Sequence, residues 1–473
     1  MNSSGQNNNT DFDLIVIGAG SAGFSASITA AELGARVALV GHGTIGGTCV
    51  NVGCVPSKAL IRAMEAVHHA NTAARFGGIA GQARVTDWRA TVANKDALVA
   101  ELRQAKYIDL LPSYDNITYL DSRAQLMPEG VAVKDGLLRA PKMIVATGSE
   151  QTVPPIPGMK DVPYLTSTTA LEMETLPDSM IVMGAGYIGC ELAQMFARAG
   201  VEVTLVCRSR LLPESEPEIS EALTEVFRNE GITVLDGISY TSIEHTQAGI
   251  TLDITRESAP ETLNAEHILI STGRRANTEG LNLSALGVEM NANGGIQIND
   301  YLQTTNPNIY AAGDVTGRDQ FVYMAAYGAK LAAEHAITGR ARAYDATAMP
   351  AVTFTDPQVS GVGLTENAAK ARGNEIKTAI LPLDYLPRAL AARDTRGLIK
   401  LVADKETDKL LGAHIMAPEG ADSIQTAALA IKHGLTAQDL AETIFPYLTT
   451  VEGLKLAAQT FDKDVTKLSC CAG

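Results

Sequence analysis

Four of the six cysteines in this 473-residue chain form two close pairs. Cys49 and Cys54 lie in a glycine-rich segment, and Cys470 and Cys471 are adjacent near the end of the sequence. Thiolates prefer soft metal ions, and they also exchange with disulfides in two-electron steps. Two pairs in one chain therefore indicate a relay, in which one pair captures a thiophilic ligand and the other performs redox chemistry on it. The alternative for the terminal pair is two accidental cysteines on a disordered end.

The first pair lies in a segment that favours reactive thiols. A regular helix would hold Cys49 and Cys54 too far apart to bond, so a disulfide requires an irregular turn, which Gly53 permits. Pro56 fits the first turn of a following helix, which places Cys54 at a helix N-terminus, where the dipole lowers the pKa of a thiol. Two buried and unreactive cysteines are the alternative.

A glycine turn just upstream belongs to an element that could bring an electron carrier to these thiols. Residues 11–17 indicate a buried strand, 18–23 a glycine turn, and 36–40 a second strand after an alanine-rich helix. This context makes the turn a dinucleotide fingerprint whose helix N-terminus binds a pyrophosphate. The acidic residue expected after the second strand is absent, because Gly41 stands there, which leaves open how the ribose is held. The cofactor-binding residues expected in the turn are Gly18, Gly20, Ser21, Ala22 and Gly23.

The same pattern returns at residues 180–206, again as strand, glycine turn, helix and strand. Two arginines, Arg208 and Arg210, follow this second strand in place of an acid. Arginines favour a 2′-phosphate, whereas a carboxylate favours a free 2′-hydroxyl, so we expect NADPH rather than NADH. The alternative is that both arginines are simply solvated. The cofactor-binding residues expected here are Gly184, Gly186, Tyr187, Ile188, Gly189, Glu191, Arg208 and Arg210.

Two fingerprints in one chain are typical of an FAD site followed by a nicotinamide site. A further apolar strand ends in Gly313 and Asp314, and a carboxylate in that place can accept hydrogen bonds from the ribityl hydroxyls of a flavin. Alone, such a turn is commonplace. Thr147, Gly148 and Gly273 end two further strands, each of which would return the chain from an inserted segment.

From residue 11 onward the chain resembles the flavoprotein disulfide reductases, through the segments 18–23, 46–58, 184–191 and 313–314. The resemblance implies that the thiolate of Cys54 faces the flavin and that Cys49 meets the substrate. It also implies that Tyr187 stacks on the flavin and moves away when the nicotinamide enters. Further residues expected at the flavin are Gly47, Thr48 and Lys58, with Glu191 as the partner of Lys58.

The C-terminal part departs from most of that family at one position. The family supplies a histidine five residues before a glutamate, but here Tyr447 precedes Glu452, and no histidine follows His433. A tyrosine, with an ordinary pKa near 10, is a poor acid–base group at neutral pH, which argues against glutathione or lipoamide as substrate. With the terminal cysteines, Tyr447 makes the chain similar to the branch of the family that reduces mercury(II). In that branch a tyrosine matching Tyr107 also approaches the metal.

The resemblance implies an α/β fold with two Rossmann-like domains and an α+β dimerisation domain. We expect FAD-binding segments at 1–150 and 276–345, an NADPH domain at 151–275 and a dimerisation domain at 346–473. In the expected reaction NADPH reduces FAD, and Hg(II) passes from small thiols to the tail of the partner subunit in a homodimer and then to the first cysteine pair. The residues expected to carry it are Cys49, Cys54, Lys58, Tyr107, Glu191, Tyr447, Cys470 and Cys471, the four cysteines as mercury ligands.

Composition excludes several other classes. The net charge of −15, without a basic cluster, argues against nucleic acid as a partner. No run of about 18 apolar residues could span a membrane, and the polar first residues do not resemble a signal peptide, so we expect a cytoplasmic protein. A conventional disulfide reductase such as lipoamide dehydrogenase and a non-enzymatic thiol chelator of metals remain the alternatives.

Overall fold

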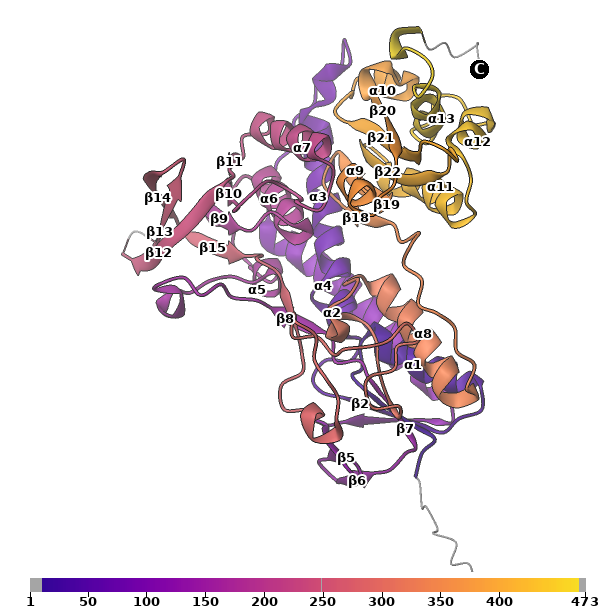
Figure 1. Cartoon of the computed structure of the whole chain (residues 1–473). Helices are drawn as coiled ribbons and strands as arrows, with labels where there is room; N and C mark the ends of the chain where they lie inside the picture. The colour runs from indigo at the N-terminus through magenta and orange to yellow at the C-terminus, as the bar shows by residue number, and fades with distance from the viewer. Residues whose placement is uncertain (1–10, 248, 468–473) are drawn as a thin grey trace, which may run out of the picture. The chain divides into compact units, whose positions relative to one another are not determined.

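The computed structural model describes residues 11–247 and 249–467 (Figure 1). The chain forms two compact units, each assembled from three separate segments. The first unit contains the described residues up to 57 together with 93–152 and 273–345, and the second contains 58–92, 153–272 and 346 onward. Within the described ranges, no helix is long and apolar enough to cross a membrane. The four-segment division given above stays a prediction.

The first unit is built on a five-stranded parallel sheet in the order β17-β7-β1-β2-β3. Its strand β1 is apolar throughout because both faces of the sheet are covered: Leu14 and Val16 pack with helices α1 and α8, whereas Ile15 and Ile17 pack into a second core. Figure 1 shows α1 and α8 beside this sheet. The bounds are β1 (Leu14–Ile17), α1 (Ser21–Glu32), β2 (Val37–Gly41), β3 (Ile117–Asp121), β7 (Lys142–Val145), β17 (Ile309–Ala311) and α8 (Val322–Thr338).

Smaller elements complete the first unit. The cysteine segment forms α2 (Gly47–Asn51) and the start of α3 (Cys54–Asn71), and a π-helical turn, η2 (Gln104–Ile108), follows α4 (Trp88–Arg103). The chain passes between the two units within α3 and within α4. An antiparallel sheet contains β4 (Gln125–Met127), β5 (Gly130–Val133) and β6 (Gly136–Leu138), and a separate strand pair contains β8 (Ser149–Gln151) and β16 (Arg274–Ala276).

The second unit contains a parallel sheet of its own, in the order β11-β10-β9-β15. Its core holds Phe196 of α6 and Phe227 of α7, both fully buried. The bounds are α5 (Ser167–Leu171), β9 (Ser179–Met183), α6 (Tyr187–Ala199), β10 (Glu202–Val206), α7 (Pro217–Asn229), β11 (Thr233–Leu235) and β15 (His267–Ile270). An antiparallel sheet is inserted as β12 (Ile238–Thr246), β13 (Gly249–Arg256) and β14 (Ala259–Ala265).

The C-terminal part of the second unit is an antiparallel sheet in the order β18-β19-β22-β21-β20. Helices α11 and α13 pack on it around a buried apolar core that includes Ile415, Ala427 and Leu454. The strands are β18 (Ala351–Thr353), β19 (Gln358–Gly363), β20 (Ile376–Pro382), β21 (Leu398–Asp404) and β22 (Leu410–Ala417). The helices are α9 (Glu366–Ala371), α10 (Pro387–Ala392), α11 (Gly420–Lys432), α12 (Ala437–Glu442) and α13 (Glu452–Gln459). The predicted fold class, with two dinucleotide-binding sheets and an α+β C-terminal domain, is confirmed.

Candidate functional site

The first glycine turn and the cysteine segment contact each other backbone to backbone. The N–H of Gly46 donates to the carbonyl oxygen of Ala19 at 2.9 Å. A Cβ atom on Gly47 would lie 2.6 Å from the Cα of Gly20, and the φ of +68° at Gly47 also favours glycine. The contact therefore needs glycine at residue 47, whereas a Cβ on Gly20 would lie 3.6 Å from the Cα of Gly47, an ordinary contact. The backbone contact fixes the helix that carries Cys49 at the N-terminus of α1.

Two further segments meet the same turn. A Cβ on Gly18 would lie 2.2 Å from the carbonyl oxygen of Ala146, and one on Gly313 would lie 3.3 Å from the Cβ of Ala22. The Ser149 hydroxyl donates to Asp314 Oδ2 at 2.6 Å, which links these two segments to each other. Residues 146–149 and 313–314 thus converge on the glycine turn at the carboxyl end of the sheet.

This arrangement fits FAD. No side chain caps helix α1 at Gly20, so its first N–H groups can bind a pyrophosphate. Glycine at residues 18 and 47 lets the segments around the turn pack closely, and the Asp314 carboxylate, bound to Ser149, would be an acceptor for the hydroxyls of a ribityl chain. Thr147 has a structural role, because its hydroxyl donates to the carbonyl oxygen of Asn277 at 2.7 Å and so joins two chain segments.

Tyr107 lies with the cysteine pair. It is carried by η2, and its ring packs edge-to-face on Phe24 with centroids 4.8 Å apart. Burial raises the pKa of Tyr107, a side-chain hydrogen bond from Ser21 opposes that rise, and negative charge on Cys49 and Cys54 adds to it. The phenol therefore stays protonated at neutral pH beside two thiols. Cys49 is half-buried and Cys54 is exposed. Single π-turns in helices recur at functional sites.

Asn51 is a residue of this site that sequence reasoning missed. Its amide donates to the carbonyl oxygens of Ile45 at 2.8 Å and Gly47 at 2.9 Å, and its own oxygen accepts from Arg103 Nη1 at 3.1 Å. Asn51 thereby holds the two ends of the segment before Cys54 together. The available signal was a short amide between two glycine-rich stretches, a residue type that commonly bonds to nearby backbone.

In the second unit, Lys58 and Glu191 form an ion pair with 2.6 Å between Nζ and Oε2. Glu191 is 5% exposed, and its other oxygen accepts the N–H of Phe354 at 2.9 Å. The Lys58 ammonium also lies 5.0 Å from the centroid of the Phe354 ring, a cation–π contact. Phe354 therefore contacts both members of the pair, and sequence reasoning did not single it out.

One face of α6 carries further contacts to the segment after β18. Gln194 donates from Nε2 to Asp356 O at 2.9 Å and accepts the N–H of Asp356 at 2.8 Å. Arg198 pairs with the Asp356 carboxylate at 3.0 Å. Because residues 191, 194 and 198 recur at helical spacing, one stripe of α6 binds residues 354–356.

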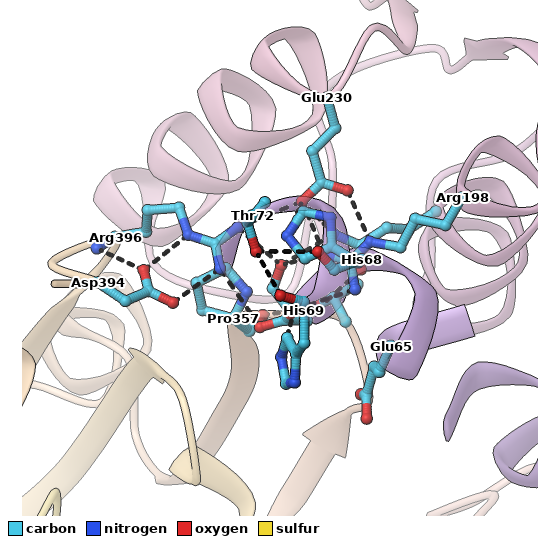
Figure 2. A network of polar contacts seen from close by, with 12 residues as sticks. Glu65, His68, His69, Thr72, Arg198, Glu230, Pro357, Asp394 and Arg396 are labelled. Atoms are coloured by element: carbon cyan, nitrogen blue, oxygen red, sulfur yellow. Dashed lines mark hydrogen bonds and ion pairs between the residues drawn. The ribbon is translucent and has the colours of Figure 1, made fainter. Parts of the chain in front are cut away.

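A buried ionic network continues from that stripe (Figure 2). Glu230 pairs with Arg198 at 2.7 Å and with Arg396 at 3.2 Å, and Arg396 also pairs with Asp394 at 2.7 Å. His68 lies 4.0 Å from Glu230. Burial is the main cause that lowers the pKa of His68. The neighbouring arginines lower this pKa further, and the neighbouring carboxylates oppose the change. No sequence motif pointed to this network.

In the second glycine turn, Gly189 is packed against the backbone and Gly186 faces open space. A Cβ on Gly189 would lie 1.9 Å from Gly184 O, whereas a Cβ on Gly186 would meet nothing within 4 Å. Helix α6 also begins without a side-chain cap, so it too can bind a phosphate. Tyr187 is half-buried at its first turn, and burial raises the pKa of this phenol.

The two arginines after β10 differ in their surroundings. Arg210 donates from Nη2 to the carbonyl oxygens of Pro213 at 3.0 Å and Ser215 at 2.7 Å, so it closes its own loop. The N–H of Leu212 donates to Ala185 O at 2.8 Å, which fastens that loop to the glycine turn. Arg208 is exposed. Of the two, Arg208 has the head group that can turn toward a ligand.

Tyr447 lies in the turn before α13, and 55% of it is exposed. The neighbouring Leu448 has a φ of +59° and donates its N–H to Glu452 Oε2 at 3.1 Å. Burial raises the pKa of Glu452. The glutamate thus binds the turn that presents Tyr447. Cys470 and Cys471 lie outside the described residues.

Comparison with known proteins agrees with this geometry. Residues 12–333 match the pyridine nucleotide-disulphide oxidoreductase family, and residues 349–458 match the dimerisation domain of that family. The chain belongs to this family. Membership implies a flavin and a pyridine nucleotide, which the two uncapped glycine turns fit.

Relatives within the family include the mercuric reductase of Bacillus cereus, 48% identical over 98% of this chain and 74% of the relative. The mercuric reductase of Streptomyces lividans is 47% identical, over 98% of this chain and 99% of the relative. Among solved structures, the HOCl-induced flavoprotein disulfide reductase RclA from Escherichia coli aligns with a TM-score of 0.83 at 29% identity, covering 94% of this chain and 99% of that chain.

Proposed function

We propose that the protein reduces Hg(II) to Hg(0) with electrons from NADPH. The balanced reaction converts one NADPH and one Hg(II) into NADP⁺, a proton and Hg(0). The main support is the 48% identity with a mercuric reductase across 98% of this chain. Tyr447 in place of a catalytic histidine supports it further, because disulfide reduction needs an acid for the leaving thiolate and reduction of a metal ion does not.

Cys49 and Cys54 are the residues that bind Hg(II) in this proposal, with Cys54 next to the flavin. FAD held at the first glycine turn would supply the two-electron transfer between the nicotinamide and the metal substrate. The two thiolates suit a soft ion that prefers two sulfur ligands. Tyr107 keeps its proton because its pKa is raised, so its O–H can donate to a thiolate sulfur as the metal leaves.

The other residues expected at the site have supporting roles in this proposal. The ammonium of Lys58, held by Glu191 and Phe354, serves as the cation beside the flavin. Tyr187 would stack on the flavin and move away when the nicotinamide enters. Arg208 and Arg210 were both expected at the 2′-phosphate of NADPH, and the loop contacts of Arg210 favour Arg208 as its direct ligand. The protein acts in the cytoplasm.

Delivery of the metal is proposed to involve the chain end and the dimer. Cys470 and Cys471 collect Hg(II) from small thiols and transfer it to Cys49 and Cys54 of the partner subunit, past Tyr447 and Tyr107. A homodimer is supported by the match of residues 349–458 to the family's dimerisation domain. Two thiols on one tether raise the effective concentration for the second ligand exchange.

The deciding experiment measures NADPH oxidation by the purified flavin-loaded protein with three acceptors. We expect turnover with Hg(II) in excess thiol, together with loss of Hg(0) vapour to the gas phase. Oxidised glutathione and lipoamide should give little turnover. Efficient reduction of lipoamide without mercury turnover would instead support a conventional disulfide reductase. Colourless protein that binds Hg(II) but does not oxidise NADPH would support a chelator.

A further inference from the structure

The end of β2, where a ribose-binding acid is expected, is closed to any side chain. A Cβ atom on Gly41 would lie 2.5 Å from the Cβ of Ala19 in the first glycine turn. It would also lie 3.1 Å from both the hydroxyl oxygen and the Cε2 atom of Tyr119. Tyr119 therefore occupies the place that the missing side chain would take. Its hydroxyl lies at the edge of the glycine turn.

An acidic residue lies at the same level on the neighbouring strand. Strand β3 runs parallel to β2, with Leu39 opposite Tyr119 and Gly41 opposite Asp121. Neighbouring strands are about 4.8 Å apart, and parallel strands end at the same edge of the sheet, where dinucleotides bind. Asp121 thus stands one strand away from the position at which the acid was expected.

The end of β3 is held in this place. The N–H of Ser122 donates to Gly41 O at 2.6 Å, which ties the residue after Asp121 to the end of β2. Asp121 is exposed. Burial raises the pKa of Tyr119 and the charge of Asp121 raises it further, so the phenol and the carboxylate are electrostatic neighbours. The nearby cation, Arg123, donates from Nε to His42 Nε2 at 3.2 Å.

We propose that Asp121, with the Tyr119 hydroxyl beside it, binds the adenosine ribose of FAD in place of the absent acid after β2. A ribose offers two adjacent hydroxyl donors, and an ionised carboxylate has two oxygens to accept them. Its charge also disfavours a 2′-phosphate at this turn. This proposal adds two residues to the FAD site of the proposed enzyme. It concerns flavin binding alone and does not depend on mercury as the substrate.

The test measures the affinity of flavin-free protein for FAD. FAD is titrated with the protein, and the change in FAD fluorescence reports binding. Asp121→Asn should weaken FAD binding about tenfold to a hundredfold, because it removes charge-assisted hydrogen bonds. Tyr119→Phe should weaken it about threefold to tenfold, since it removes one neutral hydrogen bond and keeps the ring over Gly41. Asp135→Asn, at an exposed turn between β5 and β6, removes the same charge elsewhere in the first unit and should leave the affinity unchanged.

A second ligand separates a ribose contact from a general loss of the site. An FAD analogue that lacks both adenosine ribose hydroxyls should bind the wild type and Asp135→Asn more weakly than FAD does. Asp121→Asn should bind FAD and this analogue nearly equally, because the partner of those hydroxyls is gone. If Asp121→Asn binds FAD as the wild type does, the proposal is wrong. It is equally wrong if the variant still prefers FAD by the wild-type factor. Neither readout involves mercury, so failure here leaves the proposed reaction standing, and failure of mercury turnover leaves this site standing.

Discussion

Each of the two glycine turns has a pair of cysteines near it, and the two pairs differ in burial. Cys49 is half-buried and Cys54 exposed, whereas Cys190 and Cys207 are both buried. Burial raises the pKa of Cys207 to about 11 and that of Cys190 further still. Similar local sequence patterns thus surround one pair that a ligand can reach, and one that serves as apolar packing.

The turns also differ in what completes them. The first is completed by other segments of its unit: the cysteine segment, residues 146–149 and 313–314, and the end of β3. The second is completed by its own loop, which Arg210 closes and Leu212 fastens. Ligand preference at such a turn therefore depends on neighbours that can be far away in sequence. The experiments below test each side of this comparison.

The largest expected effect separates the two cysteine pairs. Cys54→Ala should lower mercury turnover on the order of a thousandfold or more, because the ligand next to the flavin is lost. Cys49→Ala should do the same but keep the long-wavelength absorbance that a thiolate beside the oxidised flavin produces. Cys207→Ala is the matched control, since at a pKa of about 11 roughly one thiol in ten thousand is ionised at pH 7. Turnover in Cys207→Ala should stay close to wild type, and a loss as deep as that of Cys54→Ala would contradict the comparison.

The next effect contrasts one glycine in each unit. Gly47→Ala places a methyl group 2.6 Å from a backbone atom at a φ of +68°, so we expect about 2–4 kcal/mol of destabilisation and poor flavin retention. Gly186→Ala meets nothing within 4 Å, and its stability should stay within about 0.5 kcal/mol of wild type. The methyl group should nevertheless impede the pyrophosphate of NADPH. Urea unfolding of flavin-free protein and NADPH titration measure the two quantities; equal destabilisation by both substitutions would show that the turns are packed alike.

A smaller effect distinguishes the two arginines after β10. Arg208→Gln should raise the KM for NADPH about tenfold to a hundredfold and leave that for NADH nearly unchanged. Arg210→Gln removes the contacts that close the loop, so it should weaken both nucleotides by a similar, smaller factor. Steady-state kinetics with each nucleotide provide the comparison. A selective loss of NADPH affinity in Arg210→Gln alone would reverse the assignment.

The smallest effect concerns pH and the network of Figure 2. The folded protein lowers the pKa of His68 below its ordinary value of 6.5, in a site faced by Arg198, Glu230, Asp356 and Arg396. The unfolded chain therefore takes up this proton more readily, so the stability from neutral His68 is present above about pH 6.5 and is lost as the pH falls. Between pH 7.5 and 5.5, His68→Gln should lose less in Tm than the wild type does. An identical pH dependence of Tm in both proteins would show that His68 does not contribute to it.

Much of the scaffold could be predicted from local sequence. The strand, turn and helix expected at residues 11–33 are found as β1, the glycine turn and α1, because a buried parallel strand and a glycine-rich turn have strong local signals. The second such pattern, expected within residues 180–206, is likewise found as β9, the glycine turn, α6 and β10. The ion pair between Lys58 and Glu191 was also expected from the sequence, because the two side chains carry opposite charges.

The remaining features depend on packing between distant segments. Nothing near Gly41 in sequence reveals that Tyr119 fills its place, because that contact follows from the register of β2 and β3. Nothing near Arg210 shows that its head group is used by its own loop, since a lysine or arginine after a strand is equally compatible with a phosphate. Asn51 and Phe354 were missed for the same reason: each acts through backbone groups, which every sequence contains.

The strand order of the first unit has a consequence for how the chain is made. Strand β17 (Ile309–Ala311) pairs with β7 (Lys142–Val145) and is an edge strand of this sheet among residues 11–247 and 249–467. During synthesis the free edge of β7 must wait for more than a hundred and fifty further residues to leave the ribosome. For that interval the nascent sheet presents unpaired backbone groups on an apolar strand, the kind of edge that recruits other chains. Slowed translation between β7 and β17 should therefore raise the demand for chaperones more than an equal delay after Ala311.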